Sequence, residues 1–307
     1  MMSTQYVFIN GEFVPDEDAK ISVRTHAFLY GTSIFEGIRG YWREDEKQIY
    51  VFRMKEHYER MHKNSKILHM TPPYSVQEMC DITLELIRKN NMTGDVYIRP
   101  TLYKSNYGIG PKLDGPDSFM VFTCPMGEYV DISKGLSICV SSWYRLEDNA
   151  LPPRGKFAGA YVNTALIKTD AVKAGFDEAL TLNSNGFITE GSAMNFYLVE
   201  NCKLVTSREI DNILVGITRQ TIKELAKKEL GLEVEERPIN RTELYMADEA
   251  FLCGTGAQVS PITSIDHRPL GDGKVGPISK KIQDLYFEVV RGRVDKYKHW
   301  CRAVYDN

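Results

Sequence analysis

The chain has 307 residues, a formal net charge of −3, 43% hydrophobic and 26% charged residues, which is typical of a globular protein large enough for two domains. The near-neutral charge gives no reason to expect nucleic acid or a membrane as a partner, and no apolar run approaches the roughly 20 residues of a membrane span. The N-terminus lacks signal-peptide features. Six scattered cysteines, without CxxC spacing or histidine clusters, predict reduced thiols in a cytoplasmic protein and no metal site.

The first 124 residues combine strand and helix signals. The run YVFINGEFV places Asn10-Gly11 between two apolar segments, which predicts a hairpin, and QIYVFRM predicts another strand. A helix is expected over residues 55–70. Ser75 and Glu78 form a capping-box pattern ahead of MCDITLELIRKNN, so a second helix is expected to begin there.

The run DVYIRPTLY alternates between apolar and polar residues. Val96 and Ile98 face one way, while Tyr97, Arg99 and Thr101 face the other. An arginine near a tyrosine on one strand face is either part of a solvated sheet face or an anion site. The residues alone leave both interpretations open.

A domain boundary is expected after the strand SFMVFTCP. Residues 125–135 are polar and irregular, and a new strand signal begins at Leu136. We therefore expect an N-terminal α+β domain over residues 1–124, a linker over 125–135, and a C-terminal α/β domain over 136–307.

The stretch from Arg154 to Asn195 holds the most informative residues. Lys156 follows a glycine- and proline-rich turn, and Glu190 stands where a strand runs into Gly191. Residues 161–174 predict a helix, and EALTLNSNGFITEG predicts a hairpin about Asn185-Gly186. The apolar stripe expected on that helix consists of Val162, Ala165, Leu166 and Val172.

A lysine and a glutamate in this setting suggest one chemistry. An amine can hold an aldehyde cofactor as a Schiff base, and an acid can hold a proton on that cofactor's ring nitrogen. A lysine or a strand-end glutamate is more often a solvated surface residue, so neither Lys156 nor Glu190 is convincing alone.

Three further segments could bind a ligand. Val215-Gly-Ile-Thr218 places Thr218 as the expected N-cap of a helix, which is either a phosphate seat or an ordinary capped helix. Gly254-Thr-Gly-Ala257 is a small-residue turn between strands, which either admits a ligand or is simply tight. The aromatic, glycine-rich stretch from Tyr30 to Gly40 is either a pocket wall or core. A last helix is expected over residues 277–290.

Six motifs occur in one order along the chain: HAFLYGTSIFEGIR, YIRP, GKFAGAYVNT, GFITEGSAMNF, LVGITR and CGTGAQVSPI. In that order they resemble branched-chain amino acid aminotransferases, which belong to the class IV fold of pyridoxal-phosphate enzymes. The resemblance extends from about Tyr6 to beyond Gly276. Met126, where many relatives have tryptophan, and GTGAQ, where a common variant reads GTAAE, bear on side-chain preference and not on cofactor chemistry.

The resemblance implies a role for each matched residue. Lys156 would form the Schiff base with pyridoxal 5′-phosphate and move the substrate proton, Glu190 would hold the ring nitrogen, and Tyr161 would bond the phenolic oxygen. The residues implied to bind the phosphate are Arg60, Ile217, Thr218 and Thr255. The residues implied to bind substrate are Tyr30, Phe35, Gly37, Tyr97, Arg99, Tyr129, Gly256 and Ala257, with Arg99, Tyr30 and Tyr129 on the side-chain carboxylate of glutamate.

The resemblance also implies a fold, an assembly and a reaction. We expect a two-domain α/β (α+β) class IV fold with the cofactor in the interdomain cleft, and at least a homodimer in which Tyr30 and a loop over residues 107–110 come from the neighbouring chain. The expected reaction is reversible transamination of leucine, isoleucine and valine with 2-oxoglutarate.

Two alternatives stay open. D-amino acid aminotransferases and aminodeoxychorismate lyases share the lysine, the glutamate and the phosphate arginine, although EGIRGYW and YIRP favour the branched-chain type. A phosphate-ligand binding protein without chemistry would use LVGITR and GTGA alone, and the presence of both Lys156 and Glu190 argues against it.

Overall fold

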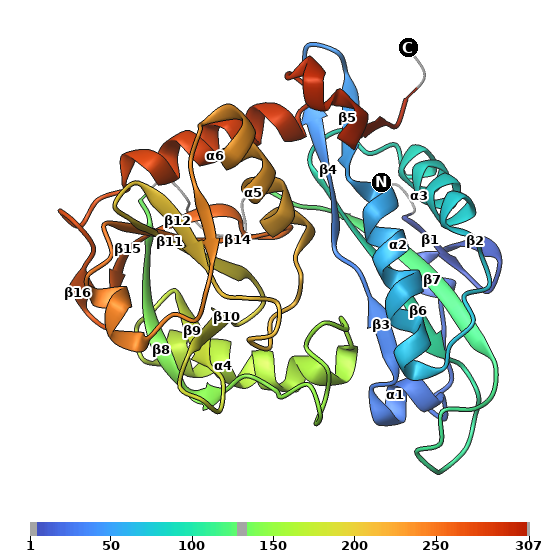
Figure 1. Ribbon diagram of the computed structural model, residues 1–307. Helices are drawn as coiled ribbons and strands as arrows, with labels where there is room; N and C mark the ends of the chain where they lie inside the picture. The colour runs from blue at the N-terminus through green and yellow to red at the C-terminus, as the bar shows by residue number, and fades with distance from the viewer. Residues whose placement is uncertain (1–4, 128–133, 306–307) are drawn as a thin grey trace. The chain divides into compact units, whose positions relative to one another are not determined.

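The computed structural model describes residues 5–127 and 134–305, which belong to two compact units (Figure 1). The first unit takes residues 1–127, 155–159 and 289–307, and the second takes 128–154 and 160–288. The sequence-based division placed Lys156 and the C-terminal tail in the second domain, whereas both lie in the first unit. Each unit is described by itself below.

The first unit is built on an eight-stranded antiparallel sheet. Its strand order is β17-β5-β4-β6-β7-β1-β2, with β3 also paired to β6. Its strands and helices are β1 (Tyr6–Ile9), β2 (Glu12–Pro15), α1 (His26–Tyr30), β3 (Ser33–Phe35), β4 (Ile38–Arg43), β5 (Gln48–Phe52), α2 (Met54–Ser65), α3 (Val76–Lys89), β6 (Val96–Lys104), β7 (Asp117–Pro125) and β17 (Cys301–Ala303). Short 3-10 helices cover Asp16–Asp18, Lys66–Leu68 and Asp295–Trp300.

Local sequence signals explain two elements of this unit. Gly11 has φ +87° between β1 and β2, which confirms the predicted hairpin. The side chain of Ser75 accepts from the backbone of Glu78, and the Glu78 side chain accepts from the backbone of Ser75, which confirms the capping box at the start of α3. The helix α2 ends at Ser65, earlier than expected.

The second unit is built on a nine-stranded mixed sheet. Its order is β10-β9-β8-β15-β14-β11-β12-β13, with β16 paired to β15, and the β8–β9, β8–β15 and β12–β13 pairs are parallel. Its elements are β8 (Leu136–Tyr144), α4 (Tyr161–Lys173), β9 (Glu178–Leu182), β10 (Ile188–Gly191), β11 (Asn195–Glu200), β12 (Lys203–Thr206), α5 (Ile217–Glu229), β13 (Val234–Glu236), β14 (Glu249–Gly254), β15 (Gln258–Ile265), β16 (Arg268–Pro269) and α6 (Pro277–Val290). Short 3-10 helices cover Ala158–Ala160, just ahead of α4, and Arg241–Tyr245.

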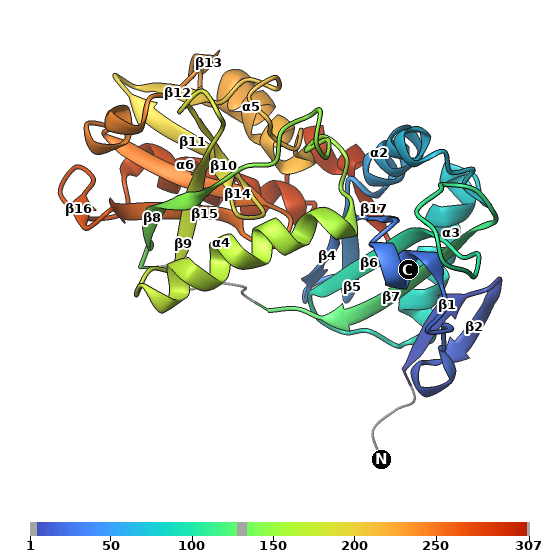
Figure 2. The ribbon, with the colours of Figure 1, turned by 90° about the horizontal axis from the view of Figure 1, so that it is seen from below.

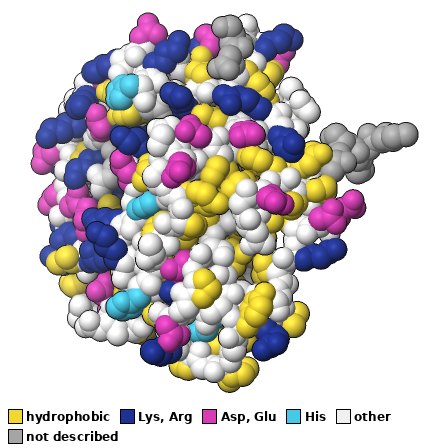
Figure 3. Space-filling model, turned by 90° about the vertical axis from the view of Figure 1, so that its right-hand side faces the viewer, with side chains coloured by type: hydrophobic (Ala, Val, Ile, Leu, Met, Phe, Trp, Pro, Cys, Tyr) yellow, Lys and Arg dark blue, Asp and Glu magenta, His cyan; other side chains and the backbone are white. Residues whose placement is uncertain are grey.

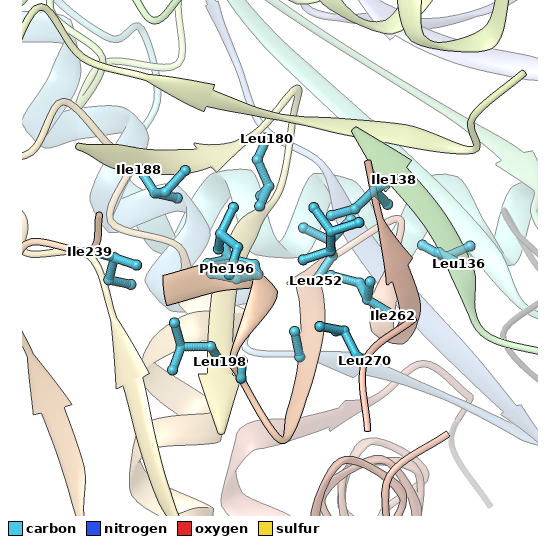
Figure 4. Close-up of a cluster of buried hydrophobic side chains, with 14 of the residues drawn as sticks. Leu136, Ile138, Leu180, Ile188, Phe196, Leu198, Ile239, Leu252, Ile262 and Leu270 are labelled. Atoms are coloured by element: carbon cyan, nitrogen blue, oxygen red, sulfur yellow. The ribbon is translucent and has the colours of Figure 1, made fainter. Parts of the chain in front are cut away.

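Apolar side chains of β8–β11, β14 and β15 form the core of this unit. Leu180, Phe196 and Leu252 are at most 1% exposed and lie together in Figure 4. Within the unit α4 runs along β8 and β9, and α5 and α6 lie on the other side of the sheet (Figures 1 and 2). This core fixes the ends of β10 and β11, where Glu190 and Asn195 stand.

The helix α4 buries a different stripe from the one that its sequence pattern predicted. Val162, Leu166 and Val172 are 68%, 40% and 54% exposed, whereas Ile167 and Ala171 are buried. The apolar stripe expected from the sequence is therefore largely exposed, and the neighbouring stripe with Ile167 and Ala171 is the buried one. Two apolar stripes lie side by side on this helix, and the pattern alone does not say which of them meets the sheet.

Apolar side chains are also exposed on the first unit. Phe28 of α1 is 66% exposed, and Tyr107 and Ile109 in the loop after β6 are 62% and 93% exposed. On the face drawn in the space-filling view, hydrophobic side chains are exposed among charged ones (Figure 3). Among the described residues, none of the helices combines the length and the apolar character needed to cross a bilayer.

Candidate active site

The backbone around Lys156 is fixed to β3 of the first unit. The Lys156 carbonyl accepts a hydrogen bond from the Phe35 N–H at 3.1 Å, and Phe157 forms a β-bridge with Ile34. Gly155 is required because a Cβ there would collide with the Phe157 ring. The Lys156 Nζ lies 4.9 Å from the centre of the Phe35 ring. The half-buried amine is therefore presented against an aromatic wall by an anchored loop.

Arg60 is held by a buried glutamate that the sequence analysis did not single out. The Arg60 Nε and Nη2 donate to Glu36 Oε1 and Oε2 at 2.8 and 2.6 Å, and His57 Nδ1 lies 2.8 Å from Glu36 Oε2. Glu36 is 0% exposed. Two of the five guanidinium N–H donors thus go to Glu36, which fixes the plane of the cation on α2.

The cluster has a defined charge state. Burial would raise the pKa of Glu36, but the charge and hydrogen bonds of Arg60, with those of His57, outweigh burial and lower it to about 2. Burial lowers the pKa of His57, and its hydrogen bond to Glu36 opposes that shift. At neutral pH the site therefore holds an ionised Glu36 against the Arg60 cation.

Four predicted substrate residues come together in the first unit. The Arg99 Nε donates to the Tyr97 hydroxyl at 2.9 Å, and its guanidinium carbon lies 4.3 Å from the centre of the Phe35 ring. A Cβ on Gly37 would lie 2.7 Å from the Tyr97 hydroxyl, so glycine is needed for this approach. An arginine between two aromatic rings suits an anion in an apolar setting, which favours the anion-site interpretation of Arg99.

Tyr30 lies apart from this group on α1. Its hydroxyl accepts a hydrogen bond from the Gly110 N–H at 2.9 Å, and its ring packs on His26 with 4.7 Å between centroids. His26 in turn lies 3.0 Å from the Gly110 carbonyl. Tyr30 and the loop after β6 thus form one unit of structure. Tyr129, the third residue expected at the glutamate carboxylate, lies outside the described residues.

Glu190 of the second unit is buried at the end of β10, with 2% of its surface exposed. Its Oε1 lies 2.6 Å from Arg145 Nη2 and accepts from the Leu214 N–H at 3.2 Å. Its Oε2 accepts from Asn195 Nδ2 at 2.8 Å. The interpretation as a solvated strand edge is wrong, and these donors favour the ionised carboxylate.

The predicted phosphate seat lies at the start of α5. The N-cap is Gly216, not Thr218 as expected, and no side chain caps the helix there. Thr218 is instead the second helical residue and is 4% exposed. The first-turn N–H groups, without a side-chain cap, and the nearby hydroxyl are the donors that a phosphate requires. The donor set therefore fits the phosphate of the implied cofactor.

The remaining predicted residues of the second unit lie on connecting segments. Tyr161 begins α4 and is half-buried. Thr255, Gly256 and Ala257 form the turn that joins β14 to β15, and the Ala257 carbonyl accepts from the Ser260 hydroxyl at 2.6 Å. The small side chains leave the backbone of this turn accessible to a carboxylate.

The residues that hold the charged groups were not predicted from the sequence. These are Glu36, His57, Arg145 and Asn195. One signal was available, because Glu36-Gly37 and Glu190-Gly191 are both acid–glycine pairs within apolar strand runs. A charge in such a run must find a partner. Glu36 is 21 and 24 residues from His57 and Arg60, and Arg145 is 45 residues from Glu190, so sequence proximity does not reveal these pairs. Asn195 is the exception, because it lies five residues from Glu190.

Comparison with known proteins agrees with this geometry. The family model Amino-transferase class IV matches residues 33–265. A probable branched-chain-amino-acid aminotransferase of Aquifex aeolicus is 49% identical over 99% of this chain and 98% of its own. The T.th. branched-chain amino acid aminotransferase complexed with N-(5′-phosphopyridoxyl)-L-glutamate is 39% identical, with a TM-score of 0.93 over 99% of this chain and 100% of the other. The same enzyme complexed with 4-methylvaleric acid is 38% identical, with a TM-score of 0.91 over the same shares.

The matches cover nearly the whole chain and include the segments that carry Lys156, Arg60 and Glu190. The sequence identities of 38 to 49% over that length show common family membership. The chain therefore belongs to the class IV aminotransferase family and, within it, to the branched-chain amino acid aminotransferases.

Proposed function

We infer that the chain catalyses the reversible transfer of the amino group of L-leucine, L-isoleucine or L-valine to 2-oxoglutarate, with pyridoxal 5′-phosphate as cofactor. The observation that carries this inference is the buried Glu190 carboxylate, held by Arg145 and by the donors of Asn195 and Leu214. Such a group can keep a proton on a pyridine nitrogen. Pyridoxal phosphate, when bound, supplies an electron sink for the charge that develops at the substrate's α-carbon.

The residues have separate tasks in this proposal. Lys156 binds the cofactor aldehyde and moves the proton at the substrate's α-carbon. Glu190 holds the proton at the ring nitrogen, and Tyr161 donates to the phenolic oxygen. Arg60 binds the phosphate, together with the α5 N-terminus at Ile217 and Thr218 and with Thr255.

The substrate groups must accept two unlike side chains. The turn at Gly256 and Ala257, with Tyr97, is proposed to hold the α-carboxylate. Arg99 is proposed to hold the side-chain carboxylate of glutamate, while Phe35 and Gly37 contact an aliphatic side chain. The relative bound to a phosphopyridoxyl-glutamate, and again to 4-methylvaleric acid, supports a site that takes both kinds of ligand.

We also propose a homodimer as the working unit and a cytoplasmic location. The exposed apolar residues Phe28, Tyr107 and Ile109 support an interface at α1 and the loop after β6, where Tyr30 is hydrogen-bonded to Gly110. The six cysteines are all free thiols, which supports a reducing compartment.

A substrate panel tests the proposed reaction. Purified protein is assayed with L-leucine and with D-alanine, each with 2-oxoglutarate, while the cofactor absorbance is followed without an acceptor. We expect L-leucine to turn over and to convert the yellow aldehyde form to the amine form, and D-alanine to do neither. Turnover of D-alanine alone, or a colourless protein that added cofactor leaves unchanged, would contradict the proposal.

A further inference from the structure

We propose that Asn195 is a positioning residue that joins the ring-nitrogen acid Glu190 to the phosphate-binding start of α5, so that the two ends of the cofactor site form one rigid piece. The inference rests on the proposed function, because it takes Glu190 and the α5 N-terminus as cofactor groups. It concerns the second unit alone and assigns Asn195 no contact with the cofactor.

Both amide protons of Asn195 are used in this bridge. The residue is 5% exposed at the start of β11, where the backbone is paired with Cys253 of β14. Its Nδ2 donates to Glu190 Oε2 at 2.8 Å and to the Leu214 carbonyl at 2.8 Å. A primary amide nitrogen carries two protons, so one group spans the acid and the segment that leads into α5.

The segment 214–216 closes the bridge from its own side. The Leu214 N–H donates back to Glu190 Oε1 at 3.2 Å. Gly216, the N-cap of α5, packs so closely on Asn195 that a Cβ would collide with Asn195 Oδ1. Its φ of −69° is open to any residue, so the need for glycine comes from this contact rather than from the backbone conformation.

The arrangement matters because the ligand is rigid. The ring nitrogen and the phosphate of one pyridoxal phosphate are held at a nearly fixed separation by the cofactor itself. When the protein already holds the carboxylate and the phosphate-binding N–H groups at this separation, less binding free energy is spent on ordering these groups as the cofactor binds. Asn195 therefore acts on both ends, unlike a residue that only stabilises Glu190.

The test compares Asn195→Ala with Asn183→Ala. Asn183 is also a buried asparagine of this unit, 4% exposed, and its Oδ1 accepts from the N–H groups of Asn185 and Phe187 at 3.1 and 3.0 Å. It serves the β9–β10 turn. Dissociation constants are measured for pyridoxal phosphate and for pyridoxal on cofactor-stripped enzyme. The ratio of the dissociation constant of pyridoxal to that of pyridoxal phosphate, called here the phosphate factor, measures the contribution of the phosphate-binding site alone. The ¹⁵N chemical shift of labelled cofactor on the holoenzyme reports the protonation of the ring nitrogen.

Asn195→Ala is expected to weaken pyridoxal phosphate binding about tenfold or more, the effect of losing one charge-assisted hydrogen bond. The factor contributed by the phosphate should fall, and the ring nitrogen should lose part of its protonation. Asn183→Ala should change neither. An unchanged phosphate factor in Asn195→Ala would confine Asn195 to Glu190 and overturn the bridge, as would an Asn195→Ala that behaves like Asn183→Ala.

Gly216→Ala tests the bridge from the phosphate side. If Asn195→Ala does not fold, Gly216→Ala in the wild-type background serves alone, and an unchanged phosphate factor there would contradict the bridge. The added methyl should lower the phosphate factor in the wild-type background, and lower it less in the Asn195→Ala background, where the colliding oxygen is gone. Equal effects in both backgrounds would contradict the proposed contact. Wild-type protein that fails to bind pyridoxal phosphate would instead remove the proposed function itself.

Discussion

Each unit buries one glutamate that is followed by glycine, and the two are held differently. Glu36 of the first unit is paired edge-on with Arg60 and also lies against His57, so its partners are two basic side chains on one helix. Glu190 of the second unit meets one arginine and two neutral N–H donors from separate segments. In the proposed function, the first arrangement fixes a cation for the phosphate of the cofactor. In the same proposal, the second holds an anion for the protonated ring nitrogen.

From this comparison we expect Glu190 to matter mainly for chemistry. Glu190→Gln should lower kcat with L-leucine by about 10²- to 10³-fold, because a neutral amide no longer stabilises the protonated ring. Steady-state kinetics measure this, and Glu178→Gln is the matched control, since Glu178 is equally buried at 2% exposure in the same unit. Similar losses in the two variants would remove the special role of Glu190.

Glu36 is expected to matter mainly for stability and for Arg60. Glu36→Gln leaves a largely buried cation without its carboxylate, which should cost about 3–5 kcal/mol in the free energy of unfolding. Denaturant titration measures this loss. The double variant Glu36→Gln/Arg60→Met should be more stable than Glu36→Gln, because neither charge is then buried. A double variant less stable than the single one would mean that the ion pair is not the cause.

The decrease of stability at acid pH is a further test of the role of Glu36. The folded-state pKa of Glu36 is lowered from 4.5 to about 2, so its contribution is present above pH 4.5 and is lost as the pH falls toward 2. The loss should be about 3 kcal/mol. Burial lowers the pKa of His57 from its usual 6.5. Its contribution to stability is therefore present above pH 6.5 and decreases as the pH falls below that value. Unfolding measured at pH 7, 4.5 and 3 should show a steeper fall below pH 4.5 for wild type than for Glu36→Gln.

The smallest expected effect concerns substrate choice. Arg99→Ala should reduce kcat/KM for 2-oxoglutarate by about 10- to 100-fold, the range for one lost charge-assisted hydrogen bond, and affect L-leucine less. The two substrates measured on one variant act as each other's control. Equal losses for both would show that Arg99 supports the site as a whole instead of binding the side-chain carboxylate.

Much of the fold could be predicted because its signals are local. The Asn10-Gly11 turn, the capping box at Ser75 and the alternation of β6 depend on residues a few positions apart. The turn and the capping box are confirmed, and the alternation holds from Val96 to Arg99, whereas Thr101 is buried. The N-cap of α5 was misplaced. Gly216 has no side chain that marks it as a cap in the sequence. It packs closely on Asn195, which is 21 residues away in the chain.

The site likewise contains residues that local motifs reveal and residues that only the tertiary packing reveals. Lys156 and Glu190 lie in the sequence motifs, and Arg60 was named from the family resemblance. The partners Glu36, His57 and Arg145 could not be named, because burial pairs them with residues 21 to 45 positions away. Asn195 is only five residues from Glu190, but the motif does not say that its amide faces that carboxylate. The exposed stripe of α4 is a related case. Val162 and Leu166 have the spacing of a core stripe, yet both are exposed in this chain, and one sequence pattern describes both situations.

The most direct test of Lys156 as the Schiff-base residue is to reduce the yellow protein with borohydride and map the labelled peptide by mass spectrometry. Reduction fixes a bound pyridoxal phosphate to the amine that holds it. We expect one phosphopyridoxyl group, on Lys156, and none in Lys156→Ala. A label on another lysine of the wild-type chain, or no label on a protein that turns over L-leucine, would contradict this assignment.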